Sequence, residues 1–237
     1  MHLRELSRAL VELVLPADCA GCGDPVAPWC PRCLPRVRGR SRPDLPDGPD
    51  VLAVGRYTGP LRTALLRYKE RGRRDLAAPL AALLAPPLDE ILDELRNELR
   101  GELRPTPVRP PPAVTWLLPA PSRAAAARAR GGDHVLRLCR VLAAGRPDLR
   151  VARPLRLAAR ARDSVGLDAV QRAENLAGSL RIRPRELPSP GAAAVLVDDV
   201  ITTGATLRSC RAALTAAGVH ADFALVLCDA TSRSGPW

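Results

Sequence analysis

The stretch Val195-Leu196-Val197-Asp198-Asp199-Val200-Ile201-Thr202-Thr203-Gly204-Ala205-Thr206-Leu207 carries the strongest signal for both fold and function. Its apolar start predicts a buried strand over residues 192–197. Two adjacent carboxylates and a Thr/Gly-rich loop follow, and a helix is expected over 206–217. Because ligands in open α/β sheets bind outside the carboxyl ends of the strands, the stretch predicts a ligand site.

The loop after this strand has the chemistry of a phosphate site. Its backbone N–H groups and hydroxyls can donate hydrogen bonds, and the helix start adds partial positive charge. The loop residues are Thr202, Thr203, Gly204, Ala205 and Thr206. The carboxylates of Asp198 and Asp199 can instead accept hydrogen bonds from a vicinal diol. Both features together favour a ribose 5-phosphate, and the simpler alternative is a helix N-terminus after a core strand, with ordinary loop acids.

The remaining pattern is that of an α/β protein. Strands are expected over 51–57, 113–118, 151–157, 179–183, 192–197 and 221–228. Helices are expected over 61–70, 77–84, 88–103, 124–144 with a break at 131–132, the latter half of 158–178, and 206–217. Strands that alternate with helices imply a parallel sheet covered on both faces. Neither G-x-x-x-x-G-K-[ST] nor G-x-G-x-x-G occurs, so the P-loop and Rossmann fingerprints are absent.

Four of the seven cysteines form a C-x2-C-x7-C-x2-C pattern: Cys19, Cys22, Cys30 and Cys33. In a reducing compartment this spacing indicates a metal site, because two C-x2-C pairs complete a tetrahedral thiolate shell for zinc. No ligand position is left open, so the zinc is expected to be structural. The alternative is four unligated thiols. The other three cysteines lie in apolar surroundings and are expected to be buried.

The charge of the 237-residue chain is uneven. The net charge is +11, and Lys69 is the only lysine. Residues 113–190 carry fifteen arginines against six acidic residues, a net +9, which favours an anionic partner unless the arginines only form a solvated face. Aromatic residues make up only 3%, which counts against base stacking as a binding mode.

No apolar run reaches the length of about 18 residues that a membrane span needs, so no membrane insertion is expected. Residues 1–15 fit a short amphipathic helix better than a lipoprotein signal, and we expect a cytoplasmic protein.

Among His2, His134 and His220 we find no convincing general base.

The 195–207 stretch resembles the PRPP-binding motif of type I phosphoribosyltransferases, and the chain as a whole resembles the ComF family of competence-associated proteins. The further motifs that carry this resemblance are the four cysteines, Tyr57-Thr58-Gly59-Pro60-Leu61-Arg62, Leu66-Arg67-Tyr68-Lys69, Arg71-Gly72, Leu118-Pro119-Ala120-Pro121-Ser122-Arg123 and Arg172-Ala173-Glu174-Asn175-Leu176-Ala177-Gly178.

The resemblance implies a type I phosphoribosyltransferase fold with a small N-terminal zinc-binding module. Residues 1–50 would hold the module and its linker, and residues 51–237 the phosphoribosyltransferase-like domain, with a helical and Pro-rich insertion at about 86–112. PRPP would bind with Mg²⁺, its pyrophosphate at Ser122 and Arg123 and its ribose diol at Asp198 and Asp199. The implied role is in DNA uptake or a related DNA process, with the DNA-uptake machinery as a partner.

Two departures from the family pattern lie outside these motifs. The family usually has R-G-[FY]-N-Q where this chain has Arg130-Gly131-Gly132-Asp133-His134, and a glutamine before R-x-x-N where this chain has residues 163–167. In addition, hypoxanthine–guanine enzymes have an acid at the position of Thr202, so 6-oxopurine salvage is not expected. The alternatives are an active phosphoribosyltransferase of nucleotide metabolism and a catalytically silent protein that binds single-stranded DNA; the acceptor and the oligomeric state stay open.

Overall fold

A computed structural model describes residues 18–25, 27–37, 39–101, 114–158 and 179–231. The helix predicted at 1–15 and the motif at 172–178 lie outside these ranges. In the part of the chain that is described, no helix has the length and apolar character needed to cross a membrane.

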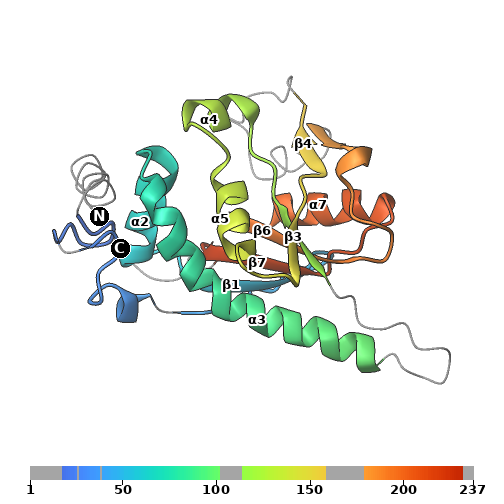
Figure 1. Ribbon diagram of the computed structural model, residues 1–237, viewed down its shortest axis with the longest axis horizontal. Helices are drawn as coiled ribbons and strands as arrows, with labels where there is room; N and C mark the ends of the chain where they lie inside the picture. Colours follow the sequence, from blue (N-terminus) through green and yellow to red (C-terminus); the bar gives the residue numbers. More distant parts are fainter. Residues whose placement is uncertain (1–17, 26, 38, 102–113, 159–178, 232–237) are drawn as a thin grey trace, which may run out of the picture.

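A five-stranded sheet forms the centre of the fold, and all its neighbouring strands are parallel (Figure 1). In spatial order its strands are β1 (Asp50–Arg56), β7 (Phe223–Asp229), β6 (Ala193–Ile201), β2 (Thr115–Pro119) and β3 (Leu149–Val151). The expectation of an α/β fold with a parallel sheet is confirmed.

The order of the strands places a switch in chain direction between β2 and β6. From β2 the chain proceeds outward to β3, whereas from β6 it proceeds the opposite way to β7. Connections that leave in opposite directions open a crevice at the carboxyl ends of the two strands between them, and ligands of open α/β sheets bind in this crevice. The 195–207 stretch therefore ends at the switch point of this sheet.

Helices cover both faces of the sheet (Figure 1). On one face lie α2 (Gly59–Glu70), α3 (Ala77–Gly101) and α5 (His134–Ala143), and on the other lies α7 (Ala205–Ala216). Because side chains alternate along a strand, Val195 and Val197 of β6 join the first cluster, and Ala194 and Leu196 join the second. The shorter segments are η1 (Leu34–Arg36), η2 (Arg74–Leu76), α4 (Ala124–Ala129) and η3 (Pro184–Glu186).

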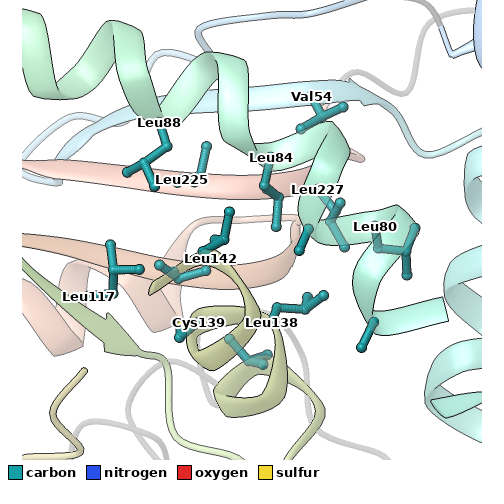
Figure 2. Packing of buried hydrophobic residues seen from close by; sticks show 14 of the residues in the cluster. Val54, Leu80, Leu84, Leu88, Leu117, Leu138, Cys139, Leu142, Leu225 and Leu227 are labelled. Carbon is teal, nitrogen blue, oxygen red and sulfur yellow. The ribbon is translucent and has the colours of Figure 1, made fainter. Parts of the chain in front are cut away.

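The larger core cluster joins helices and strands that are far apart in sequence. Figure 2 shows Leu84 of α3 and Leu138 and Leu142 of α5 packed toward Leu225 and Leu227 of β7. Leucine and alanine fill this core because aromatic residues are scarce, as the composition predicts.

One helix, α3, takes in two helical stretches that the sequence suggested as separate. It continues through Pro86 and Pro87, although proline removes a helix hydrogen bond and crowds the preceding turn. Leu84 and Leu88, on either side of the prolines, are fully buried. Tertiary packing thus outweighs the local preference of the chain.

The strand predicted over 151–157 is wrong as a single element. Pro154 has no N–H to donate, and it separates β3 from β4 (Leu155–Leu157). Strand β4 pairs in antiparallel fashion with β5 (Leu180–Ile182) in a small second sheet. Strand β6 is longer than predicted and runs to Ile201, so both carboxylates lie within it.

Candidate functional site

The predicted ligand residues of two separate motifs meet at the carboxyl edge of the sheet. The loop of residues 202–204 follows β6, and the segment that ends in Ser122 and Arg123 follows the neighbouring strand β2. The Ala120 N–H donates to the Val197 carbonyl at 2.8 Å, which extends the pairing of the two strands to this edge. The two loops thus flank the switch point.

The two adjacent carboxylates have different surroundings. Asp199 continues the side-chain alternation of Val195 and Val197, so it lies on the face covered by α2 and α5. Its Oδ2 accepts hydrogen bonds from Lys69 Nζ at 2.7 Å and from His134 Nε2 at 2.6 Å, and only 6% of the residue is exposed. Asp198 is half-buried, and its Oδ1 accepts a bond from the Asp199 N–H at 2.8 Å.

These contacts set the charge of the edge. Burial alone would raise the pKa of Asp199, but the hydrogen bond from His134 and the charge of Lys69 outweigh it and hold this pKa well below its usual range. Burial, followed by the negative charge of Asp199, raises the pKa of Asp198 to about 8. At neutral pH the edge is therefore less negative than two adjacent aspartates suggest, so it repels an anionic ligand less.

Lys69 and His134 are site residues that the sequence analysis missed. Lys69 lies in the last turn of α2, and His134 is the first residue of α5. The Tyr68 hydroxyl donates to the His134 carbonyl at 2.8 Å, which joins the two helices beside the pair. The signal in the sequence was that Lys69 is the only lysine and that His134 stands where the resembled family has glutamine.

The segment after β2 is held by Asp133, the residue that precedes α5. The Ser122 hydroxyl donates to Asp133 Oδ2 at 2.9 Å. The other oxygen, Oδ1, accepts the Leu136 N–H at 3.1 Å and so caps the N-terminus of α5. A residue from the first departure noted in the sequence thus holds the predicted pyrophosphate segment in place.

The loop after β6 turns sharply at Gly204, which has a φ of 71° and caps α7. Thr202 and Thr203 are exposed, and the Thr203 hydroxyl oxygen accepts the Ala205 N–H at 3.4 Å. The side chain of Leu45 lies against Gly204, and a Cβ at position 204 would collide with it. The positive φ favours glycine here, and a larger residue would also force the Leu45 side chain to move.

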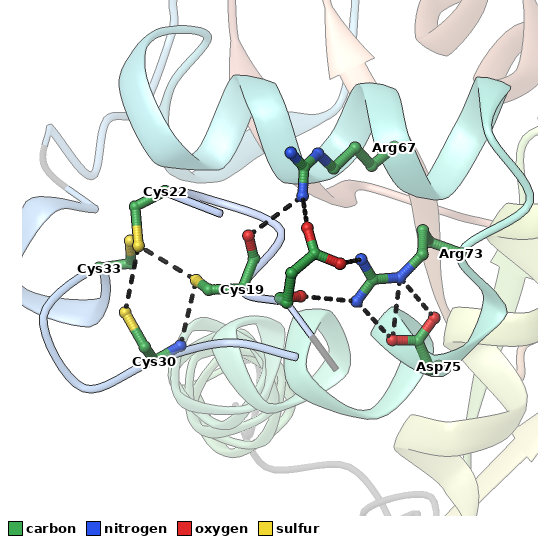
Figure 3. Close-up of polar contacts among 8 residues, drawn as sticks. Cys19, Cys22, Cys30, Cys33, Arg67, Arg73 and Asp75 are labelled. Carbon is green, nitrogen blue, oxygen red and sulfur yellow. Dashed lines mark hydrogen bonds and ion pairs between the residues drawn. The ribbon is translucent and has the colours of Figure 1, made fainter. Parts of the chain in front are cut away.

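The four cysteines of the N-terminal motif lie together (Figure 3). Their Sγ atoms are all within 4.8 Å of one another, with 3.8 Å between Cys19 and Cys33 and 3.6 Å between Cys22 and Cys30. A tetrahedron with Zn–S bonds of about 2.3 Å has edges of about 3.8 Å. These four residues could therefore hold a zinc ion.

The environment of Cys19 supports a thiolate. Burial raises the pKa of its thiol, but backbone N–H groups, including that of Cys30 at 3.3 Å from Sγ, outweigh this effect and lower the pKa to about 6. Cys19, Cys30 and Cys33 are almost fully buried, whereas Cys22 is exposed. As predicted from their apolar surroundings, Cys139, Cys210 and Cys228 are buried elsewhere.

The cysteine cluster is attached to α2 through Asp18 (Figure 3). Arg73 donates to Asp18 Oδ1 at 2.8 Å, and Arg67 donates to the Asp18 carboxylate and to the Cys19 carbonyl. Asp75 pairs with Arg73 at 2.9 Å and fixes that guanidinium. The helix that carries Lys69 to the candidate site thus also anchors the cluster.

No family model and no curated protein matches the chain. Among solved structures, hypoxanthine phosphoribosyltransferase from Trypanosoma cruzi with the product IMP is similar at 18% identity and a TM-score of 0.32, over 65% of this chain and 71% of that one. A mutant of that enzyme in a ternary substrates complex is similar at 18% identity and a TM-score of 0.33, over 71% of this chain and 74% of that one. An alanine mutant from an analysis of an invariant aspartic acid in these enzymes is similar at 17% identity and a TM-score of 0.33, over 66% of this chain and 73% of that one. At this level of similarity, the comparison assigns no activity to the chain.

We predict that the purified protein carries one zinc ion per chain and that Cys22→Ser loses it. Because Cys22 is exposed, this substitution removes a ligand without opening a cavity in the core. The variant is also expected to lose stability, since metal binding contributes to folding. Metal analysis by mass spectrometry measures the content, with Cys210→Ala as the control that keeps its zinc. Wild type without zinc after purification free of chelators would contradict the prediction.

We predict that Gly204→Ala destabilises the protein more than Gly218→Ala does. Both positions have positive φ, at 71° and 78°, so both variants bear the left-handed strain of about 1–2 kcal/mol. A Cβ at 218 has nothing within 4 Å, whereas one at 204 meets Leu45 and adds about 1 kcal/mol or more. Urea unfolding gives both values.

Leu45→Ala in the Gly204→Ala background should restore part of this difference in unfolding free energy. Equal destabilisation at the two glycines would show that Leu45 does not pack on the loop.

Proposed function

We propose that the switch point between β2 and β6 binds the ribose 5-phosphate part of PRPP. The observation that carries the proposal is the convergence of two loops from neighbouring strands on one edge, beside two adjacent carboxylates near the end of β6. The 5-phosphate would lie on residues 202–206, at the N-terminus of α7. Ser122 and Arg123 would receive the pyrophosphate.

The two carboxylates have unequal parts in this proposal. Asp198 is half-buried and would take up a ribose hydroxyl directly. Asp199 would do so through Oδ1, since Oδ2 already accepts from Lys69 and His134. The two cationic or polar partners keep Asp199 ionised and fix its orientation, so it meets the diol as a preorganised acceptor.

Transfer from PRPP would break the bond between C1 of the ribose and the pyrophosphate oxygen, and the acceptor would form a new bond to C1. This chain would contribute positioning and stabilisation of the oxocarbenium-like sugar by nearby carboxylates. Mg²⁺, taken up together with PRPP, would supply positive charge that neutralises the leaving pyrophosphate. His134 is buried and bonded to Asp199, so we assign it no role as a base for the acceptor.

The biological role follows from the resemblance to the ComF family, which supports a cytoplasmic protein with a part in DNA uptake or a related DNA process. The net charge of +9 over residues 113–190 agrees with an anionic partner. Thr202 stands at the position of the acid in hypoxanthine–guanine enzymes, so we do not propose 6-oxopurines as acceptors.

We predict that the wild type binds PRPP in the presence of Mg²⁺ and that Asp198→Ala weakens this binding by about two- to tenfold at neutral pH. The raised pKa of Asp198 leaves its carboxyl group largely protonated there, and a hydrogen bond between neutral groups is worth about 0.5–1.5 kcal/mol. Isothermal titration calorimetry measures the affinity. Asp222→Ala is the matched control, because this acid precedes β7 at the opposite edge of the sheet and pairs only with Arg211 among the described residues.

Asp199 is not the residue to test, since its removal would leave the half-buried Lys69 without its counter-charge and would destabilise the fold. If the wild type shows no binding at millimolar PRPP, or if Asp198→Ala binds as well as the wild type, the assignment of the site is wrong.

Two assays distinguish three roles: an active transferase, a DNA-binding protein and a PRPP-binding sensor without turnover. Release of pyrophosphate from PRPP with a panel of bases would identify an active transferase. Titration with a labelled oligothymidylate at two salt concentrations would identify DNA binding, because phosphate contacts make affinity fall steeply as salt rises. PRPP binding without turnover and without DNA affinity would favour a sensor role in the DNA process; neither PRPP nor DNA binding would refute all three.

A further inference from the structure

A large cavity lies next to the end of β2 and the segment that follows it. Its volume is about 820 Å³. Its walls come from the end of β2, from α4, from the first turns of α5, from β4 and from Arg183, which follows β5. Pockets of about 300–1,000 Å³ hold small organic molecules and cofactors. The cavity reaches the predicted pyrophosphate segment at Ser122, but no residue of the 202–206 loop lines it.

The lining is strongly basic. It includes six arginines and a single acid, Asp133; the arginines are Arg128, Arg137, Arg140, Arg153, Arg156 and Arg183. The acid offers little compensation, because both of its oxygens are engaged by Ser122 and by the N-terminus of α5, and Arg153 approaches it only to 3.8 Å. Six guanidinium groups around one space repel one another unless an anion lies between them.

Three of these six arginines have no acidic or carbonyl partner among the described residues that would account for their position. The guanidinium groups of Arg128, Arg140 and Arg156 make no hydrogen bond or ion pair with any other residue in the described ranges. They come from α4, α5 and β4, and all three elements line this cavity. Solvated arginines on a single helix face would not converge in this way, so the arrangement indicates a binding site for a multiply charged anion.

The rest of the lining is apolar. Pro119, Leu136, Leu155 and Leu157 contribute to the walls, and Leu136 and Leu155 are almost fully buried. A pyrophosphate group has no apolar part that would cover these leucines, and its charge is smaller than that of six arginines. A ligand that satisfies both parts of the lining carries several phosphates and a flat ring, because guanidinium groups bind phosphate in bidentate fashion and also stack on rings.

We propose that this cavity is a second binding site, for a nucleoside diphosphate or triphosphate, separate from the ribose 5-phosphate site. The phosphates lie among the guanidinium groups of α4, α5 and β4, and the base lies against the leucines of α5 and β4. The cavity shares Ser122 with the proposed pyrophosphate position, but neither Asp198 nor the 202–206 loop lines it, so it is separate from the proposed ribose 5-phosphate position.

Calorimetric titration with ADP, ATP, adenosine and inorganic tripolyphosphate tests the proposal. We expect ATP to bind more tightly than ADP, adenosine not to bind, and tripolyphosphate to bind more weakly than ATP because it lacks the ring. Saturating ribose 5-phosphate should leave the ATP affinity unchanged, because it occupies the other site.

Arg140→Gln and Arg156→Gln should each weaken ATP binding by about tenfold or more, since each removes charged hydrogen bonds to phosphate. Arg150→Gln is the matched control: Arg150 is exposed on β3, bonds main-chain carbonyls and does not line the cavity. Asp198→Ala should keep full ATP affinity even where it loses PRPP, so the two proposals fail separately.

The proposal is overturned if ATP does not bind at millimolar concentration or if both arginine variants bind it as the wild type does. It is also overturned if ribose 5-phosphate displaces ATP, since the nucleotide would then occupy the residue 202–206 loop. Equal affinity for ATP and tripolyphosphate would show that the cavity binds a simple polyanion and does not recognise a nucleotide. If oligothymidylate binds and depends on Arg140 and Arg156 while ATP does not bind, the ligand of the cavity is nucleic acid and the proposal is wrong.

Discussion

The carboxylate of Asp199 is the interaction on which the arrangement of the site depends. It lies inside β6, the central strand of the sheet, and it binds Lys69 of α2 and His134 of α5 within one buried cluster. A buried charge without partners would cost several kcal/mol, so the strand and both helices must meet at this point. The contact therefore holds the C-terminal end of α2 and the N-terminal end of α5 at the carboxyl edge of the sheet. The loops that form the candidate site lie at the same edge.

The same helix joins the site to the cysteine cluster. Arg67, two residues before Lys69, holds Asp18 and the Cys19 carbonyl, so α2 is fixed at its last turns by the cluster on one side and by β6 on the other. A zinc ion at the four thiolates would thus order a segment that also positions the candidate site. Figure 3 shows Arg67 of α2 beside Cys19 of the cluster.

Local sequence signals were sufficient for much of the fold and for part of the site. The apolar run before Asp198, the loop to Thr206 and the cysteine spacing each predict their own structure, because each depends on neighbours in sequence. The break at Pro154 is also encoded locally, yet it was missed, since apolar residues on both sides of the proline resemble one strand. The continuity of α3 through Pro86, the pairing of Asp199 with Lys69 and His134, and the convergence of arginines from α4, α5 and β4 depend on tertiary contacts, which no local pattern contains.

The central claim is that the carboxyl edge at the β2–β6 switch point is a ribose 5-phosphate site, and backbone amide NMR during a titration with ribose 5-phosphate tests it most directly. Phosphate bound at the start of α7 would shift the amide resonances of Thr203, Gly204 and Ala205, because these N–H groups would donate to it. The amides at the opposite edge of the sheet, such as that of Phe223, would stay unchanged. If the loop amides do not shift at saturating ligand, or if the shifts occur only elsewhere, the account of this site is contradicted.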